Sequence, residues 1–272
     1  MLIILTALPC EGAPIVSKYN LKKQTEINAF QIYKNDQITL IVSGLGKTAA
    51  ASAVGFIHAL TNLRSHSAWL NIGIAGHSDL ELGAGFIANK IIDCSTQKTY
   101  YPPITFTPSC ITDQLHTVDQ PDSEYHQQGG VDMEAAAFYA TASRFSSGEL
   151  VQCYKVVSDN KQSPVRKFQK HEVTEMVENN MRDISSLTNH LLEVSNALET
   201  VNQIPELFDK INDQVRLTHS EQLLVKARLR QIKLLNPKTS INLSEVINSS
   251  SSQKIIQHLD KIISSQSIYF QS

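Results

Sequence analysis

The sequence predicts a three-layer α/β/α domain followed by a small helical extension. Leu2–Leu5 is an unbroken apolar run, typical of a central strand covered on both faces. Ala68–Ile72 and Val151–Val157 are similar runs, and segments of helical character lie between the predicted strands. Strands that alternate with helices favour a mixed, mainly parallel central sheet. We expect this domain to span residues 1–199 and the helical extension to span residues 200–272.

Length, charge and cysteine content exclude several classes of protein. The 272 residues are enough for one large domain with an appendage. A net charge of −2 makes nucleic acid an unlikely main partner. No apolar run approaches the roughly 20 residues of a membrane-spanning helix. The four cysteines are scattered without a CxxC pair, which indicates reduced thiols in a cytoplasm and argues against a metal site.

The first predicted strand leads into a segment with a candidate functional carboxylate. We predict that residues 6–12 form a loop, which places Glu11 at the carboxyl end of the strand. In open α/β sheets this edge is where ligands bind. A single loop glutamate is more often solvated, so Glu11 becomes informative only together with other residues.

A glycine loop follows the next pair of predicted strands, Ala29–Tyr33 and Gln37–Val42. Ser43–Lys47 contains Gly44 and leads into an alanine-rich helix predicted over Thr48–Leu60. A strand, a glycine loop and a helix N-terminus in this order can receive anionic or hydroxyl groups on backbone N–H donors. The loop matches neither the Walker pattern nor GxGxxG, so it can also be a tight turn.

Small residues follow the strand predicted at Ala68–Ile72. Gly73–His77 lets the backbone approach another group closely, and a further strand is predicted to end at about Ile92. We expect Tyr100–Pro108 and His116–Gln128 to be irregular, because the first holds three prolines among aromatic residues and the second is polar.

The stretch Gly129–Ala140 is the one around which the chain is organised. Its glycine pair leads to Asp132, and an alanine-rich helix is predicted from about Ala135. Glu134 therefore lies where a strand end passes into a helix, where the helix N-terminus stabilises a carboxylate. The strand Val151–Val157 follows, and it places Asp159 at a carboxyl strand end as well.

The last part of the chain has a different character. Val173–Leu198 follows one helical period and predicts one long amphipathic helix. Residues 201–272 hold nine Lys and Arg against six Asp and Glu, a net charge of +3, whereas the preceding part has a net charge of −5. A capping box at Thr218–Glu221 predicts a helix to Leu235. A polar hinge at 249–252 and a short helix at 254–263 follow. The basic residues of the first helix indicate a solvated face more than a nucleic-acid surface (Lys226, Arg228, Arg230 and Lys233).

Five short stretches together resemble a known superfamily. They are Thr6-Ala-Leu-Pro-Cys-Glu11, Ser43-Gly-Leu-Gly-Lys-Thr-Ala-Ala-Ala51, Asn71-Ile-Gly-Ile-Ala-Gly76, Val131-Asp-Met-Glu-Ala-Ala136 and Val157-Ser-Asp159. In this order they resemble the purine-nucleoside/uridine phosphorylase superfamily, and within it the methylthioadenosine/S-adenosylhomocysteine nucleosidases and futalosine-hydrolase-like enzymes. The resemblance covers about residues 1–199 and implies a phosphorylase-like fold. It also implies a small-molecule nucleoside substrate, no cofactor and a homodimer.

The resemblance implies a role for each matching residue. Glu11 and Asp159 are the expected catalytic residues: Glu11 activates a water at the anomeric carbon, and Asp159 helps to protonate the purine at N7. Glu134 is expected to bind the ribose hydroxyls, with Met133 packed against the sugar. The other expected substrate-binding positions are Asp132, Gly44, Ile74, Ala75, Gly76, Lys155 and Ser158. Cleavage of a ribosyl C–N bond independently calls for an acid at the base, a carboxylate at the sugar and a base for water.

Departures from the superfamily pattern keep other functions open. Ile74 stands where family nucleosidases often have serine, and Lys155 where they have arginine, which weakens any bidentate clamp. The aromatic residue that stacks on the base has no identifiable counterpart between Tyr101 and Gly129. No arginine precedes Arg64, which favours hydrolysis over phosphorolysis. The alternatives are a phosphate-dependent phosphorylase, a noncatalytic nucleoside-binding or sensing protein, and a scaffold without a ligand.

Overall fold

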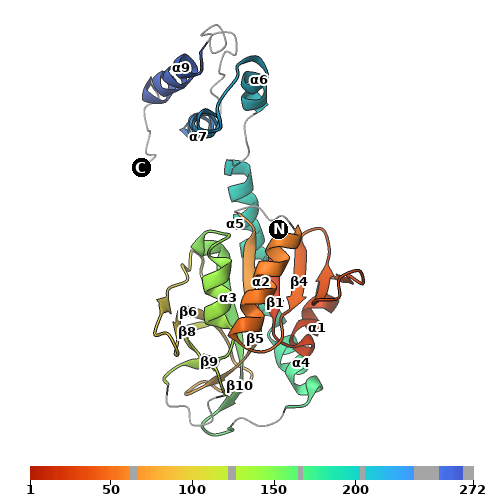
Figure 1. The fold of residues 1–272 in the computed structure, drawn as a ribbon. Helices are drawn as coiled ribbons and strands as arrows, with labels where there is room; N and C mark the ends of the chain where they lie inside the picture. The colour runs from red at the N-terminus through yellow and green to blue at the C-terminus, as the bar shows by residue number, and fades with distance from the viewer. Residues whose placement is uncertain (62–65, 122–126, 165–167, 203–205, 236–250, 266–272) are drawn as a thin grey trace. The chain divides into compact units, whose positions relative to one another are not determined.

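The computed structural model describes residues 1–61, 66–121, 127–164, 168–202, 206–235 and 251–265. It divides into two compact units, Met1–Asn196 and Ala197–Ser272 (Figure 1). Each unit has a hydrophobic core made of its own residues. The predicted domains, a nucleosidase-like domain at residues 1–199 and an extension at 200–272, stay predictions.

A mixed sheet forms the centre of the first unit. Four parallel neighbours run through its middle in the order β4, β1, β5 and β10, and they are the strands Ile38–Val42, Leu2–Thr6, Ala68–His77 and Val151–Asn160. At one edge, β3 (Gln31–Lys34) and β2 (Lys22–Lys23) continue the sheet in antiparallel pairing. Every residue of β1, β4 and β10 is buried, because both faces of these strands are covered.

Beyond β5 the sheet closes on itself. β5 pairs with β9 (Gly130–Asp132), which continues through β8 (Ile111–Thr117) and β6 (Gly85–Asp93) to β10. Because β10 also pairs with β5, these five strands form a ring. The short β7 (Thr99–Tyr100) pairs with β6 outside this ring. The ring brings the ends of β5, β9 and β10 together.

Helices cover the sheet on both sides (Figure 1). On one side α2 (Lys47–Thr61) packs against α3 (Ala135–Ala142), and both contribute buried side chains to the core around Ile3 and Trp69. Elsewhere α1 (Pro9–Lys18) packs against α4 (Lys170–Asn179), and both contact β5. α5 (Met181–Asn202) follows α4. The predicted three-layer fold class is thus confirmed.

The segment that contains Glu11 is a helix, and its prediction as a loop was wrong. Pro9 occupies the first turn of α1, where its missing N–H costs nothing and its fixed φ favours helix entry. The Glu11 carboxylate then accepts the Leu8 backbone N–H at 2.8 Å, which caps the helix. The helix also contains Pro14, a residue that is disfavoured inside helices.

Three other expectations also need correction. The strand predicted to end at Ile72 runs on to His77 as β5. β8 begins at Ile111 and takes in residues 116 and 117, the start of the region expected to be irregular. The single long helix expected from Val173 is broken at Asn180 into α4 and α5. The Asn180 side chain explains the break, since it accepts the Tyr154 hydroxyl at 2.9 Å and donates to the Gly83 carbonyl at 2.9 Å.

The second unit is a small helical assembly. α6 (Glu206–Gln214), α7 (His219–Leu235) and α9 (Ser252–Ser265) surround a core that includes Phe208, Val225 and Leu259. The predicted capping box is present, because the Glu221 carboxylate accepts the Thr218 N–H at 2.8 Å. The predicted last helix corresponds to α9, whereas residues 249–250 of the predicted hinge lie outside the described residues. Within the part of the chain that the structure describes, no helix is long and apolar enough to span a membrane.

We expect a chain that ends at Asn196 to fold independently. In the part of the chain that the structure describes, the core around Ile3 and Trp69 takes no residue from beyond position 196. Thermal unfolding followed by circular dichroism should therefore give one cooperative transition for the truncated chain, near that of the first unit in the full chain. A truncated chain without a cooperative transition would contradict the division into two units.

Candidate active site

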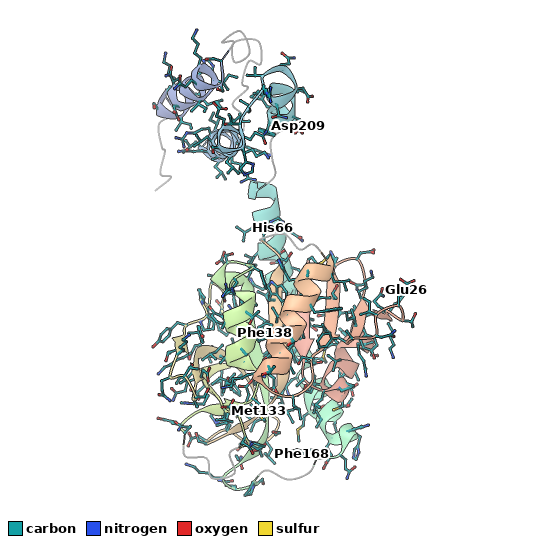
Figure 2. The ribbon with its side chains drawn as sticks, in the orientation of Figure 1. Glu26, His66, Met133, Phe138, Phe168 and Asp209 are labelled. Carbon is teal, nitrogen blue, oxygen red and sulfur yellow. The ribbon has the colours of Figure 1, made fainter. Side chains whose placement is uncertain are left out.

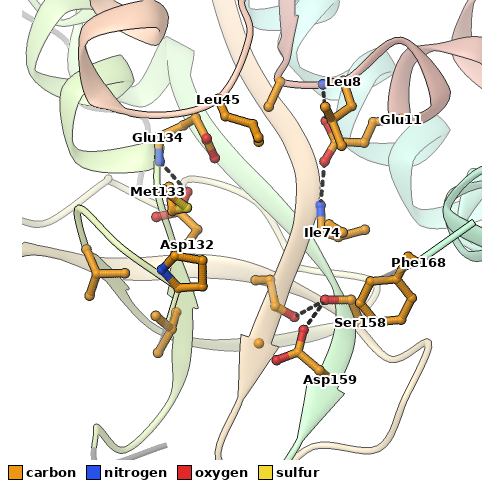
Figure 3. Close-up of a pocket in the computed structure, with 16 residues that line it drawn as sticks. Leu8, Glu11, Leu45, Ile74, Asp132, Met133, Glu134, Ser158, Asp159 and Phe168 are labelled. Atoms are coloured by element: carbon orange, nitrogen blue, oxygen red, sulfur yellow. Dashed lines mark hydrogen bonds between the residues drawn. The ribbon is translucent and has the colours of Figure 1, made fainter. Parts of the chain in front are cut away.

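The carboxyl ends of β1, β5 and β10 and the junction between β9 and α3 enclose a cavity of about 160 Å³ (Figure 3). We call it the carboxylate pocket after Glu11, Asp132, Glu134 and Asp159, which all line it. Its remaining lining is mostly apolar and consists of Ala7, Leu8, Leu45, Ile74, Ala75, Gly76, Val118, Pro121, Val131, Met133, Ser158 and Phe168. Segments that are distant in sequence thus supply one site.

Glu11 is held rigidly at one side of the pocket. Its side chain is 2% exposed. One carboxylate oxygen accepts the Leu8 N–H, and the other accepts the Ile74 N–H at 3.0 Å. Burial raises the pKa of Glu11, although the two N–H donors and the Lys155 ammonium act in the opposite direction. The Ile74 contact fixes the first helix to strand β5 at the point where the pocket begins.

Glu134 lies on the facing side, at the N-cap of α3. Its Oε1 accepts the Gly46 N–H at 2.7 Å. Gly46 has a φ of +92°, a conformation that glycine adopts without strain. Burial, followed by the negative charge of Asp132, raises the pKa of Glu134 to about 7. The glycine loop therefore holds Glu134 through one carboxylate oxygen and contributes Leu45 to the lining. Among the residues that the structure describes, none donates a hydrogen bond to the second oxygen.

Asp159 and Ser158 come from the end of β10. The register of β10 against β5 shifts between Val157 and Asp159, and such a bulge re-aims side chains. The two consecutive residues can therefore both line the pocket. The Ser158 hydroxyl donates to the Asp159 carboxylate (Figure 3). It also lies 3.2 Å from the Ala75 carbonyl oxygen.

Asp132 and Lys155 form a buried ion pair behind this lining. The Lys155 ammonium lies 2.9 Å from Asp132 Oδ2, and the two side chains are 1% and 0% exposed. Asp132 lines the pocket, whereas Lys155 does not. Of the residues predicted for the site, Gly44 and Lys155 are the two outside the lining, and the structure brings the others together.

Phe168 is a pocket residue that sequence reasoning missed. It precedes α4 and lies at the same end of the first unit as Met133 (Figure 2). A second apolar cavity of about 350 Å³ shares Phe168, Leu8 and Ile74 with the carboxylate pocket. The sequence gives only a weak signal for Phe168, because this residue belongs to no periodic pattern. The base-stacking aromatic sought between Tyr101 and Gly129 was not found in the described lining, and residues 122–126 lie outside the described residues.

The charged side chains in the described lining of the pocket all have the same sign. Among the lining residues that the structure describes, four are acidic and none is Lys or Arg. The described residues also contain no cluster of three or more His, Cys, Asp or Glu side chains suited to hold a metal ion. The arrangement can bind hydroxyl groups, accept or donate protons and stabilise positive charge in a partly apolar cavity.

Comparison with known proteins identifies the fold. Neither a protein-family model nor a curated protein sequence matches the chain. Among solved structures, the apo 5′-methylthioadenosine nucleosidase of Arabidopsis thaliana is similar with a TM-score of 0.57 and 15% identity, over 70% of this chain and 95% of that one. The S. pneumoniae 5′-methylthioadenosine/S-adenosylhomocysteine nucleosidase with a transition-state inhibitor is similar with a TM-score of 0.52 and 19% identity, over 72% and 99%. A futalosine hydrolase mutant of Helicobacter pylori is similar with a TM-score of 0.51 and 14% identity, over 70% and 98%.

These similarities confirm the phosphorylase-like fold that the five sequence motifs predicted. At 14–19% identity they establish the fold and not the reaction. The reaction has to be argued from the site itself.

Proposed function

We propose that the protein is a nucleosidase that hydrolyses the N-ribosidic bond of a purine nucleoside, or of a 5′-modified purine nucleoside, and releases the free base. One observation carries the proposal: Glu11, Glu134 and Asp159 come from three separate elements and line one small pocket. The nucleosidase folds described above support it. No metal or organic cofactor has a role in the proposed reaction.

Each carboxylate suits one demand of the reaction. Cleavage of the C–N bond leaves positive charge on the sugar and negative charge on the purine. Carboxylates stabilise the first charge, and a proton neutralises the second. We assign the proton transfer to the purine to Asp159 and the ribose hydroxyls to the second oxygen of Glu134. Glu11 activates the water. Its two backbone bonds fix its orientation, so that little reorganisation is needed at the moment of reaction.

The charge of the pocket favours water over phosphate as the nucleophile. A phosphate dianion placed among carboxylates is repelled unless cations compensate for it. The described lining offers no Lys or Arg to do so. Hydrolysis is therefore the preferred reaction and phosphorolysis the alternative.

The apolar part of the pocket supports a 5′-modified substrate. Leu8, Ile74 and Phe168 lie between the carboxylate pocket and the second apolar cavity, which also includes Val173. An apolar 5′-substituent would bury surface there that an unmodified hydroxyl would not.

Ile74 is the observation that favours a second candidate, a noncatalytic nucleoside-binding protein. Its side chain adds an apolar wall next to Glu11, where the proposed mechanism requires a polar, water-holding position. Such a protein would bind nucleosides through Glu134 without releasing base.

Release of free base distinguishes these functions. We expect the full chain to release adenine or hypoxanthine from at least one of methylthioadenosine, adenosylhomocysteine, adenosine, inosine or a futalosine-type nucleoside, in buffer without phosphate. The matched control is Glu11→Gln, which should release little base while it still binds the nucleoside in a thermal-shift assay. Strictly phosphate-dependent release would establish the phosphorylase, and binding without release would establish the sensor.

A cytoplasmic homodimer is the setting that we propose for this activity. The four cysteines are free, which supports a reducing compartment. Leu45 just before α2 and Leu60 in its last turn are 61% and 48% exposed, and a self-association surface along this helix would cover them. Sedimentation velocity on the full chain tests the oligomeric state.

A further inference from the structure

The buried Lys155 is the group that the proposed mechanism does not use. It lies on β10 and is almost completely shielded from solvent. A buried ammonium is costly unless a carboxylate pairs with it and hydrogen bonds fix both groups. The groups that surround Lys155 therefore indicate its role.

Asp132 fixes Lys155 in place through a fully occupied carboxylate. Oδ2 accepts the Lys155 ammonium and also the Ala135 N–H at 2.8 Å, and Oδ1 accepts the Thr117 hydroxyl at 2.7 Å. The Glu134 N–H points to Oδ2 as well, at 3.2 Å (Figure 3). Because the same carboxylate holds the lysine and the backbone of Glu134, the cation has a defined position relative to Glu134.

Gly73 brings the same cation close to Glu11. A Cβ atom at position 73 would lie 3.0 Å from Glu11 Oε1 and 3.4 Å from Lys155 Nζ. Both charged groups therefore lie over the backbone of Gly73 with no side chain between them. Any larger residue at this position would come between them.

One cation thus faces three carboxylates. The charged and titratable groups that act on Lys155 are Asp132 of β9, Glu134 at the start of α3 and Cys153 of its own strand. Glu11 of α1 is in turn influenced by Lys155. Asp132 is in direct contact with Lys155. The positive charge of Lys155 also acts on Glu11 and Glu134, which line the facing sides of the pocket.

We propose that Lys155 is a positioning residue that serves as the internal counter-ion of the carboxylate pocket, so that Glu11 and Glu134 can be ionised together without a cation in contact with the nucleoside. Lys155 acts through Glu11 and Glu134 and does not touch the substrate. The catalytic consequence rests on the proposed nucleosidase function, whereas the electrostatic consequence does not.

The proposal predicts opposite effects for the two members of the ion pair. An opposite charge at about 4–6 Å lowers the pKa of a carboxyl group by about 1–3 units, and a like charge raises it. Replacing Lys155 by methionine should therefore raise the pKa of Glu11 and Glu134 by about a unit or more. Asp132→Asn leaves the cation and removes an anion, so it should lower the pKa of Glu134. Lys155→Arg keeps the charge and should keep both pKa values near those of the wild type.

Carboxyl ¹³C NMR on full-length protein labelled at glutamate measures these pKa values without any need for activity. Glu11→Gln and Glu134→Gln assign the two resonances. Unchanged pKa values in Lys155→Met would overturn the proposal. So would a fall of the Glu134 pKa toward 4.5 in both single variants, because that pattern indicates a loosened pocket.

A double variant covers the case in which Lys155→Met does not fold. Removal of one partner leaves a buried charge unpaired, whereas removal of both leaves a neutral pair of similar shape. In Lys155→Met/Asp132→Asn the pKa of Glu11 should still rise, and an unchanged value would refute the proposal. If the wild type releases base, the acidic limb of its pH–rate profile should move to higher pH in Lys155→Met. If it releases none, the proposed function fails while the NMR result still decides the role of Lys155.

Discussion

Replacement of Asp159 by asparagine should reduce the turnover of purine nucleosides by at least about 100-fold, because positioned proton transfer contributes 10²–10⁴. Asparagine has nearly the same shape and can accept the Ser158 hydroxyl as Asp159 does. It cannot, however, give a proton to a departing purine. The loss should therefore appear in kcat and leave KM nearly unchanged.

A nucleoside whose base leaves without a proton provides the sharpest control for Asp159. A 7-methylpurine nucleoside carries positive charge on its base, so the base departs neutral and needs no general acid. We expect the Asp159→Asn enzyme to recover much of its rate on this substrate. Asp36→Asn, at an exposed position, controls for the substitution itself. Equal losses on both substrates would show that Asp159 has a different role.

The fold could be predicted where a local pattern determines it. The apolar runs at β1, β4 and β10 and the alanine-rich α2 and α3 appear in the sequence as they do in the structure. The ring of strands could not be predicted, because pairings such as β5 with β9 join residues that are distant in sequence. The break at Asn180 is also invisible to periodicity, since Val177 and Ile184 on either side keep the same helical spacing.

The residues of the site also divide into those that the sequence identifies and those that only the fold brings together. Glu11, Glu134 and Asp159 could be singled out because each occupies a recognisable motif at the end of a predicted element. Lys155 was predicted to bind substrate, and its place behind the pocket lining could not be predicted, because only the fold brings Asp132 to it. Phe168 approaches the pocket through tertiary structure alone.

Glu134 connects the charge of the pocket to the stability of the fold. Its pKa of about 7 in the folded protein exceeds the usual 4.5, so folding favours the protonated form. This contribution is complete below about pH 4.5 and is lost as the pH rises through 7, for a total of about 3 kcal/mol. Ribose binding needs the ionised form as hydrogen-bond acceptor. Activity should therefore rise over the pH range in which stability falls.

Glu134→Gln should separate the two effects. The Gln carbonyl can still accept the Gly46 N–H, but the other position becomes a donor and no longer accepts a ribose hydroxyl. Loss of a hydrogen bond to a charged group costs about 1.5–3 kcal/mol, which corresponds to about 10- to 150-fold in kcat/KM for ribosides. For 2′,3′-dideoxy analogues the same change should have little effect, and equal losses on both would refute the assignment to the sugar.

The pH dependence of the same variant tests the cause. The wild-type kcat/KM should rise about tenfold per pH unit below 7 and then level off, and the Gln variant should lose this rise. Its melting temperature should match that of the wild type at pH 5 and exceed it at pH 8, because no charge has to form beside Asp132. Glu81→Gln, at an exposed position, should change neither property. A Gln variant that melts below the wild type at pH 8 would mean that the charge of Glu134 stabilises the fold. In that case the ionised carboxylate that the reaction needs would not lower the stability of the protein.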